Sequence, residues 1–236
     1  MKALARHLAE RPLRGAFAGF SCLAILLIPG VLAGAQTPSL KDTFKGSFLV
    51  GAAVNPAQFT EQDARDAALV KAQFNTITPE NVLKWERVHP QPGTYSFELP
   101  DRYVAFGEKN HMFIVGHTLL WHNQTPAWVF QDDKGHSADR ETLLKRLHDH
   151  IHTVVGRYNG RINGWDVVNE ALDEDGTLRQ SPWLKIIGED YIAKAFQFAL
   201  RLLAGGCGGG ALPQGRGRVQ WQIGSLPAAA GRPQTR

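Results

Sequence analysis

The stretch Ile162-Asn163-Gly164-Trp165-Asp166-Val167-Val168-Asn169-Glu170 runs from an apolar segment directly into two polar residues. A buried parallel strand is a short and nearly continuous apolar run, and residues 162–168 have that character. The polar pair that follows would lie at the carboxyl end of the strand, where α/β folds place their functional groups. This stretch therefore predicts both a strand and a site.

The same succession of apolar run, polar cluster and helical pattern occurs three times upstream. We expect strands at 48–54, 74–77, 112–117 and 162–168, and helices at 61–72, 99–109, 139–158 and 190–203. Four strand–helix units in a row imply a parallel sheet, buried on both faces, with the helices outside. A polar cluster after every strand favours the first four units of a (β/α)8 TIM barrel over a doubly wound sheet, whose site lies at one switch point.

Composition excludes several classes of protein. The chain has 236 residues, of which 43% are hydrophobic and 20% charged, so it is neither mainly disordered nor collagen-like. Two cysteines do not make a disulfide scaffold. The sequence pI of about 9.2 comes from the ends, because residues 1–35 carry +3 and residues 204–236 carry +4, which leaves −3 for the middle. The positive net charge therefore indicates no nucleic-acid partner.

Residues 1–35 have the order of a secretory signal peptide: basic residues, an apolar run over 16–32, and then Ala33-Gly34-Ala35. Cleavage after Ala35 would leave Gln36 as the first residue. An uncleaved membrane anchor is the alternative, since an apolar run of about 17 residues is at the lower limit for a span. Pro29 and the Ala-x-Ala ending favour removal. We expect a secreted or periplasmic protein that does not contact the membrane after cleavage.

The end of the chain, residues 204–236, has nine of the 24 glycines and no Asp, Glu or Lys. Neither a helical nor a strand period can be drawn through its Gly-rich start. We expect an irregular tail that is not part of the fold formed by residues 36–203. A flexible basic tail is one interpretation, and a shifted reading frame, which we favour, is the other.

Glu170 is the strongest candidate for catalysis. A carboxyl group at the rim of a barrel, sheltered by aromatic walls, has a raised pKa and can donate a proton as a general acid. The alternative is a glutamate at the start of a helix, stabilised by the helix dipole. Asn169 beside it suits a donor to a sugar hydroxyl next to the cleaved bond.

Two further clusters follow the second and third strands. Glu80, Asn81 and Lys84 would share one face of a short helix and grip vicinal hydroxyls, although Glu80 and Lys84 also suit a surface ion pair. His117 and Trp121 frame the third cluster. A tryptophan at this rim can stack on a sugar ring, or it can fill the core.

No feature of the sequence calls for a metal or a cofactor. His148 and His152 lie four residues apart, but neither a catalytic glutamate nor a third ligand accompanies them. We also find no phosphate-binding loop, no nucleophile-elbow serine and no aromatic-basic pattern typical of nucleic-acid binding. We expect no metal site, no cofactor and no nucleic-acid partner.

Three blocks together resemble glycoside hydrolase family 10, the endo-1,4-β-xylanases: Thr78–Trp85, Gly116–His122 and Trp165–Ala171. The likeness extends over residues 44–198. It implies a (β/α)8 barrel that cleaves xylan internally with retention of configuration. It also implies xylan and xylo-oligosaccharides as partners.

The resemblance assigns a role to each candidate residue. Glu170 would be the general acid/base. Asn169, His117 and Trp121 would line the subsite at the scissile bond. The neighbouring xylose, on the non-reducing side, would be bound by Glu80, Asn81 and Lys84.

The family's pattern continues with four more strand–helix units, and one of their strands carries a nucleophilic carboxylate that has no counterpart here. Retaining hydrolysis needs two carboxyl groups about 5 Å apart. We therefore expect a truncated xylanase that is inactive or folds poorly. Two alternatives stay open: a non-catalytic remnant that binds xylo-oligosaccharides, and a barrel glycosidase of other β-glucan specificity. The sequence does not indicate an oligomeric state.

Overall fold

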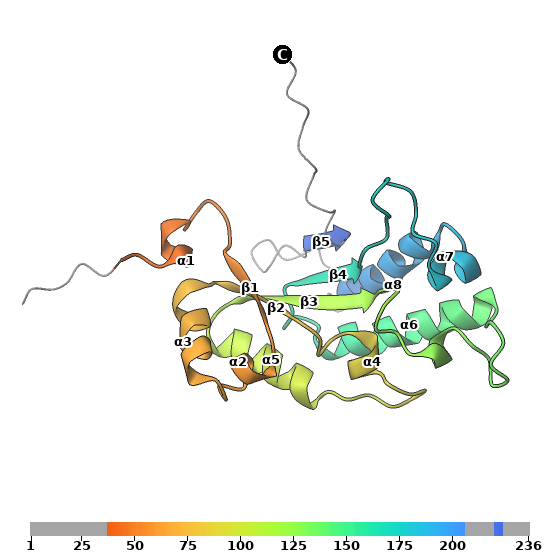
Figure 1. The fold of residues 1–236 in the computed structure, drawn as a ribbon, viewed down its shortest axis with the longest axis horizontal. Coiled ribbons are helices and arrows are strands. Elements are labelled where there is room, and N and C mark those ends of the chain that lie inside the picture. Colours follow the sequence, from red (N-terminus) through yellow and green to blue (C-terminus); the bar gives the residue numbers. More distant parts are fainter. Residues whose placement is uncertain (1–36, 206–219, 224–236) are drawn as a thin grey trace, which may run out of the picture. The chain divides into compact units, whose positions relative to one another are not determined.

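A computed structural model describes residues 37–205 and 220–223 of the chain. Within these residues the structure is built on a parallel sheet in which the strand order follows the chain order (Figure 1). The strands are β1 (Gly51–Val54), β2 (Thr76–Pro79), β3 (Phe113–Leu120), β4 (Gly164–Val168) and β5 (Gln220–Ile223). Each strand pairs in parallel with the next, as repeated strand–helix units require.

The connections between strands contain the helices. They are α1 (Leu40–Thr43), α2 (Pro56–Phe59), α3 (Ala64–Gln73), α4 (Trp85–Val88), α5 (Glu98–Lys109), the 3₁₀ turn η1 (Ala127–Val129), α6 (Arg140–Arg157), α7 (Pro182–Ile187) and α8 (Tyr191–Gly205). The helix α5 packs closely on the sheet at Gly107. A Cβ atom there would lie 2.5 Å from Ile114 and 3.1 Å from Ile77. These isoleucines therefore mark the sheet face that the helices cover.

The helix α6 illustrates how the sequence pattern becomes a core. The Asp139 side chain caps its first turn by accepting a hydrogen bond from the backbone N–H of Thr142. The three- and four-residue spacing predicted an apolar stripe, and the structure buries it except at Leu144, which is only partly buried. The buried apolar residues of the stripe are Leu143, Leu147, Ile151, Val154 and Val155.

The expectation that the strands are buried on both faces is wrong for the face that points away from the helices. Ala53 is exposed on that face, and Thr78, His117 and Asp166 are only partly buried. No helix among the described residues packs over these positions. A face left open in this way can carry polar side chains without the cost of desolvation.

The first strand is shorter than predicted. It begins at Gly51, where pairing with Thr76 of β2 starts, and the two apolar residues expected to open it are exposed. Phe48 is 58% exposed and Leu49 51%, and Phe48 stacks on Phe44 with ring centroids 4.6 Å apart. A strand at the edge of the sheet pairs on one side only, so it buries fewer residues than the apolar run suggested.

The prediction of an irregular tail is also wrong at one point, because β5 lies within it. Residues 220–223 pair in parallel with β4, with Gly164 opposite Gln220 and Val168 opposite Ile223. The free backbone groups at the edge of β4 are ready partners for an added strand. The predicted signal peptide, residues 1–35, lies outside the described residues. Within the described ranges, no helix combines the length and the apolar character needed to span a bilayer.

Candidate active site

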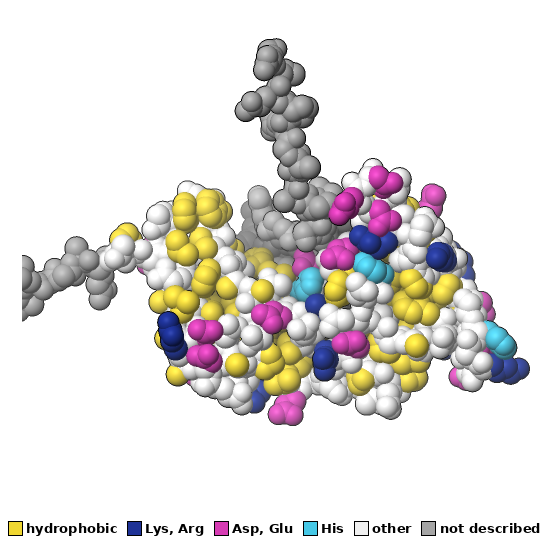
Figure 2. Space-filling model, in the orientation of Figure 1, with side chains coloured by type: hydrophobic (Ala, Val, Ile, Leu, Met, Phe, Trp, Pro, Cys, Tyr) yellow, Lys and Arg dark blue, Asp and Glu magenta, His cyan; other side chains and the backbone are white. Residues whose placement is uncertain are grey.

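Glu170 follows β4 directly, and its backbone has an unusual conformation. Its φ angle is +50°, in the left-handed region that side chains other than glycine rarely adopt. Such a conformation costs about 1 kcal/mol and is found preferentially at functional sites. In Figure 2, charged and histidine side chains gather over β3 and β4, the strands that lead to this part of the molecule.

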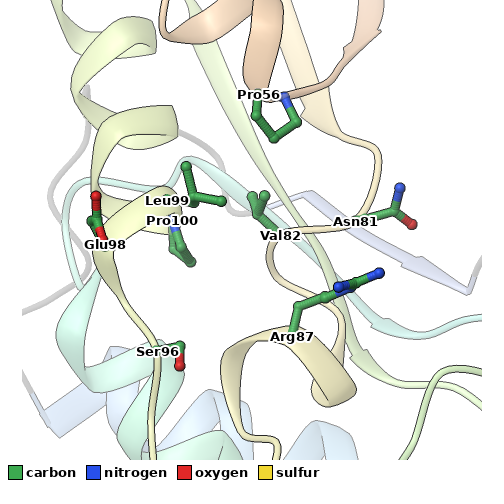
Figure 3. A pocket seen from close by; sticks show the side chains of 8 residues that line it. All are labelled: Pro56, Asn81, Val82, Arg87, Ser96, Glu98, Leu99 and Pro100. Carbon is green, nitrogen blue, oxygen red and sulfur yellow. The ribbon is translucent and has the colours of Figure 1, made fainter.

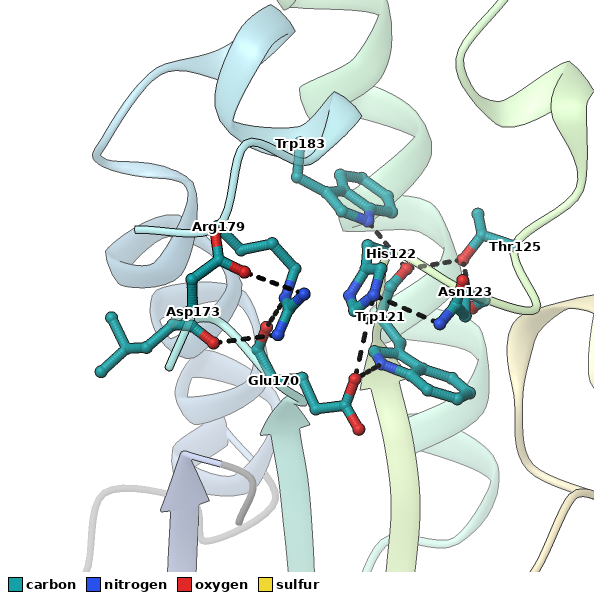
Figure 4. A network of polar contacts seen from close by, with 9 residues as sticks. Trp121, His122, Asn123, Thr125, Glu170, Asp173, Arg179 and Trp183 are labelled. Atoms are coloured by element: carbon teal, nitrogen blue, oxygen red, sulfur yellow. Dashed lines mark hydrogen bonds and ion pairs between the residues drawn. The ribbon is translucent and has the colours of Figure 1, made fainter. Parts of the chain in front are cut away.

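Trp121, which follows β3, lies against the carboxyl group of Glu170. The indole Nε1 donates a hydrogen bond of 2.9 Å to Oε2 of Glu170 (Figure 4). Nε2 of His122 lies 3.8 Å from the same oxygen. No other described residue forms a hydrogen bond or ion pair with Oε1. One carboxyl oxygen is therefore held by the protein, and the other has no hydrogen-bond or ion-pair partner among the described residues.

The carboxyl group of Glu170 is less sheltered than the sequence suggested. Its side chain is 41% exposed, and the aromatic wall that we expected around it consists of Trp121 on one side. The strand β4, which leads to Glu170, lies between β3 and β5 in the sheet, and Trp121 comes from the β3 side.

Lys84 links the cluster after β2 to this carboxyl group. Its Nζ lies 4.6 Å from the centre of the Trp121 ring, a distance suited to a cation–π contact. Burial lowers the pKa of Lys84, and the carboxylates of Glu170, Glu86 and Glu80 oppose that shift. The ammonium group thus lies within the field of both Glu170 and Glu80, the two acids that the sequence analysis had placed in one site.

Asn81 continues the series of contacts that runs from Glu170 through Trp121 to Lys84. Its Oδ1 accepts hydrogen bonds from Nζ of Lys84 at 3.2 Å and from Nε2 of Gln124 at 3.3 Å. Its Nδ2 has no partner among the described residues and is available to a ligand. Gln124, whose φ is +48°, was not among the predicted site residues.

The placement of Glu80, Asn81 and Lys84 on a short helix is wrong. The helix α4 begins only at Trp85, and Lys84 is its N-cap. Residues 80–84 form turns, and Lys84 and Asn81 meet because the backbone N–H of Lys84 donates to the carbonyl of Asn81 at 2.9 Å. The side chains of Lys84 and Asn81 still meet, but a turn brings them together and not one face of a helix.

His117 lies on the open face of the sheet and is paired with Asp166. The two residues are opposite each other in β3 and β4, so their side chains share that face. Nδ1 of His117 is 2.9 Å from Oδ2 of Asp166. A carboxylate accepts this bond, which orients the ring and leaves Nε2 for another partner. Asp166 was missed, although its place in the strand alternation could have indicated it.

Asn169 occupies the position between β4 and Glu170. Its backbone N–H donates to the carbonyl of Leu120 at 2.9 Å, and the residue is only 7% exposed. Its side-chain amide forms no hydrogen bond to any described residue. The hydrogen-bonding groups of this amide are thus unused by the described residues, and its contact with a sugar hydroxyl stays a prediction. No hydrogen bond or ion pair joins His117 to Glu170 among the described residues, and the bonded partner of His117 is Asp166.

Arg179 fastens the loop that follows Glu170. Its Nε donates to the carbonyl of Glu170 at 3.0 Å and one NH group to that of Leu172 at 3.1 Å, while the other pairs with Asp173 at 2.9 Å. Burial and the Arg179 charge lower the pKa of His122, against the carboxylates of Glu170 and Asp173. Arg179 and His122 were not among the predicted site residues, because nothing in their spacing points to Glu170.

The histidines on α6 do not form a metal site. His148 pairs with Asp149 at 3.1 Å, and its ring packs edge-on against Phe198 and near His152. No group of three or more potential metal ligands occurs in residues 37–205 and 220–223.

Comparison with known proteins gives the family. The family model for glycosyl hydrolase family 10 matches residues 39–204. The chain is 42% identical over 178 residues to endo-1,4-beta-xylanase A of Xylanibacter ruminicola and 45% identical over 168 residues to the beta-1,4-xylanase of Dictyoglomus thermophilum. These matches cover 75% and 70% of this chain, and 48% and 45% of those proteins.

Similar solved structures belong to the same family. A GH10 endoxylanase from a sugarcane soil metagenome is 47% identical, with a TM-score of 0.68 over 70% of this chain and 50% of that one. A mutant structure in complex with xylotriose is 41% identical, with a TM-score of 0.66 over 72% of this chain and 51% of that one. The chain belongs to glycosyl hydrolase family 10, and the expected fold, the first strand–helix units of a (β/α)8 barrel, is confirmed. The chain spans about half the length of the relatives it matches.

Proposed function

We propose that this chain acts in the hydrolysis of β-1,4-xylosidic bonds in xylan, with Glu170 as the general acid/base. The observation that carries the proposal is the hydrogen bond from Nε1 of Trp121 to Oε2 of Glu170, 2.9 Å long. It fixes the carboxyl group beside an aromatic ring and leaves Oε1 free. The family supports the substrate, since its similar members are named as xylanases.

The proposed chemistry follows from where these groups lie. Oε1 of Glu170 would protonate the glycosidic oxygen as the bond to the leaving sugar breaks, and the same group would later accept a proton from the attacking water. The amide of Asn169 would hold a hydroxyl of the sugar at the cleaved bond. Lys84 and Asn81 would donate to the hydroxyls of the next xylose. A second carboxylate must act as nucleophile, and the proposal assigns that role to none of the described residues.

A second function, binding of xylo-oligosaccharides without cleavage, is favoured by one observation. The proposed sugar-binding groups contact one another at 3.2 Å (Lys84 to Asn81) and 4.6 Å (Lys84 to the Trp121 ring), and the negative charge of Glu170 takes no part in these two contacts. Binding should therefore survive exchange of the Glu170 carboxyl group for an amide that still accepts from Nε1 of Trp121.

One experiment separates the two functions. Release of reducing ends from linear xylan and affinity for xylotriose are measured for the full chain and for the Glu170→Gln variant, which keeps an oxygen to accept from Trp121. Acid/base catalysis predicts cleavage by the unchanged chain, with a loss of at least about 100-fold in the variant and unchanged affinity. Binding without cleavage by both proteins supports the second function. A chain that neither binds nor cleaves contradicts both.

We also propose that the protein is exported, either secreted or to the periplasm, with residues 1–35 removed. The support is the basic, apolar and Ala-x-Ala order of that segment. Sequencing the amino terminus of the protein from the culture medium or periplasm tests the proposal. A first residue of Gln36 is expected, and recovery of the intact amino terminus from the membrane fraction would contradict it.

A further inference from the structure

Within the described residues, the parallel sheet has an open face and two free edges that extend beyond the proposed site. The pocket in Figure 3 adjoins that site, because Asn81 contributes to both. The open face instead follows the strands, with Ala53 exposed on it and Thr78, His117 and Asp166 only partly buried. We propose that a second copy of this chain covers the open face, so that two copies close their sheets into one barrel. The β1 edge of each copy then lies beside the β5 edge and the helix α8 of the other.

Apolar side chains are exposed where the chain enters β1, at the first edge of the sheet. Phe44, Phe48 and Leu49, here called the β1 patch, are 37%, 58% and 51% exposed. In Figure 2 hydrophobic side chains gather over α1 and the segment that leads into β1. Among the described strands β1 pairs only with β2, so its other side presents free N–H and C=O groups. An apolar patch beside an unpaired strand is typical of a surface that another chain covers.

The helix α8, near the opposite edge of the sheet, is apolar over most of its surface. Its polar residues up to position 202 are Lys194, Gln197 and Arg201, whose three- and four-residue spacing places them in one stripe. The helix packs against α6 and β4, yet Leu200 is 46% exposed. A helix with so wide an apolar surface needs cover on more than one side. The side away from α6 is the side of β5, which no described helix covers.

The β1 patch and Leu200 lie at the same level along the strands. Phe48 and Leu49 precede Gly51, the first residue of β1, so they lie at the amino end of the sheet. The helix α8 runs back along β4, because the chain must return to the end where the parallel strand β5 begins. At about 1.5 Å per residue, Leu200 lies about 13 Å from the start of α8, which is about the length of β4. Leu200 is therefore level with the start of β4.

A second copy fits this arrangement because one chain carries both halves of the contact. The sheet is parallel throughout, so its two edges differ, with β1 at one and β5 at the other. A two-fold rotation about an axis parallel to the strands sets the β1 edge of each copy beside the β5 edge of the other and keeps all strands parallel. It also brings the β1 patch to the level of Leu200 of the other copy. The two junctions are equivalent, so the assembly closes at two copies.

The open face can be enclosed without burying an unpaired histidine or aspartate. Nδ1 of His117 lies 2.9 Å from Oδ2 of Asp166, so these two groups already have partners. Such pairing matters because an isolated ion is costly to bury. The same rotation brings Glu170 of both copies to one end of the barrel. Two copies thus supply two carboxyl groups, the number that glycoside hydrolysis needs.

The test is the mass of the full chain in solution without sugar, so its result is independent of the proposed function. Sedimentation equilibrium should give twice the 26.0 kDa of one chain. Leu49→Lys places a charge in the β1 patch, and Leu200→Glu places one on α8. Every junction contains one site of each kind, so either variant damages both junctions. We expect each variant to weaken association at least about 100-fold, because a charge buried without a partner is costly.

A mixture of the two variants gives the sharpest result. In a mixed pair one junction has both natural leucines, and the other brings the introduced lysine and glutamate together. Association should therefore return to within about tenfold of the unchanged chain, although neither variant associates by itself. Leu99→Lys is the matched control, because Leu99 is 37% exposed and lies on α5, which packs against the inner strands β2 and β3. This control should still form pairs.

Three results would overturn the proposal. A full chain with the mass of one copy means that no second copy covers the open face. Association that survives both single changes is driven elsewhere, for example by the apolar residues 16–32. A mixture that stays dissociated excludes the two-fold arrangement, even if the unchanged chain forms pairs. Urea unfolding establishes that each variant is folded, and Phe48→Lys replaces Leu49→Lys if that variant unfolds.

Discussion

Nε1 of Trp121 and Oε2 of Glu170 are 2.9 Å apart, although the two residues are 49 positions apart in the sequence. The contact exists because β3 and β4 are parallel neighbours, so the residues that follow them emerge at the same edge of the sheet. The carbonyl oxygen of Trp121 is itself held by Nε1 of the buried Trp183 at 2.9 Å. Trp183 thus holds the backbone of Trp121, and Trp121 in turn orients the carboxyl group of Glu170.

Replacement of this tryptophan by phenylalanine tests the contact. Trp121→Phe keeps an aromatic ring near Lys84 but removes the N–H donor to Glu170. We expect xylotriose affinity to fall by about five- to tenfold, and stability to fall by about 1 kcal/mol. Titration and urea unfolding measure the two effects.

Trp128→Phe is the control for that variant, because Nε1 of Trp128 donates to the carbonyl of Pro90 at 3.0 Å and not to the site. It should lose similar stability and keep its affinity. Equal losses of affinity in both variants would mean that the indole N–H of Trp121 has no special role.

Gly116 is predicted to be intolerant of any side chain. A Cβ atom at this position in β3 would overlap the indole ring of Trp165, which lies opposite it in β4 and is almost fully buried. Neither the backbone nor the ring can move without disturbing the core, so Gly116→Ala should cost about 3 kcal/mol or prevent folding.

Gly156→Ala provides the contrasting case. Gly156 lies in α6, and a Cβ atom there would meet nothing within 4 Å. This variant should gain up to about 1 kcal/mol, because alanine favours the helix. Unfolding curves for both variants give the comparison, and a Gly116→Ala protein as stable as the unchanged one would contradict the packing described here.

Arg179→Ala should loosen the loop that carries Glu170. The variant removes two hydrogen bonds to the carbonyls of Glu170 and Leu172 and an ion pair with Asp173. We expect a loss of about 2 kcal/mol, since two part-buried carbonyl groups would lose their charged donor. Amide hydrogen exchange should accelerate in residues 171–180 in particular.

Arg140→Ala serves as the comparison for Arg179. Arg140 forms two hydrogen bonds with Asp190, but both side chains are close to half exposed. Such a surface pair contributes less than about 1 kcal/mol. If both variants lost the same stability and left exchange in residues 171–180 unchanged, the anchoring role of Arg179 would be wrong.

A pair of buried histidines should make the fold sensitive to acid. Nδ1 of His89 lies 3.2 Å from Nδ1 of His150, and the His150 ring stacks on Trp85 with centroids 3.7 Å apart. Burial lowers the pKa of His89 from 6.5 to about 4, against the field of Asp149. Burial, together with the neighbouring His89, also lowers the pKa of His150 well below its usual value.

The sign of the effect follows from these pKa directions. Below pH 6.5 these histidines bind protons in the unfolded chain but stay unprotonated in the folded protein, so acid favours unfolding. The free energy of unfolding should be greatest above pH 6.5 and fall towards pH 4 by up to about 1.4 kcal/mol per pH unit for each histidine that stays neutral in the folded protein. In His89→Phe, whose ring can still stack on Tyr95, this slope should be smaller. Urea unfolding at pH 7, 5.5 and 4.5 measures it, and identical slopes would refute the assignment.

Local pattern alone determined the succession of strands and helices, because each element has a period that its own residues display. The apolar stripe of α6 and the runs that became β3 and β4 needed no knowledge of their neighbours. Glu170 and Asn169 were also evident, since a polar pair directly after an apolar strand must lie at the edge of the sheet.

Tertiary structure decided what each of those residues touches. The hydrogen bond between Trp121 and Glu170, the pairing of His117 with Asp166 and the anchoring by Arg179 depend on the order of the strands and the path of loops. The open face of the sheet could not be predicted from the sequence either, because an apolar run is expected whether one or both faces of its strand are covered. Spacing along the chain records local periodicity, whereas contacts between distant residues arise only when the packed sheet brings its neighbouring strand ends to one edge.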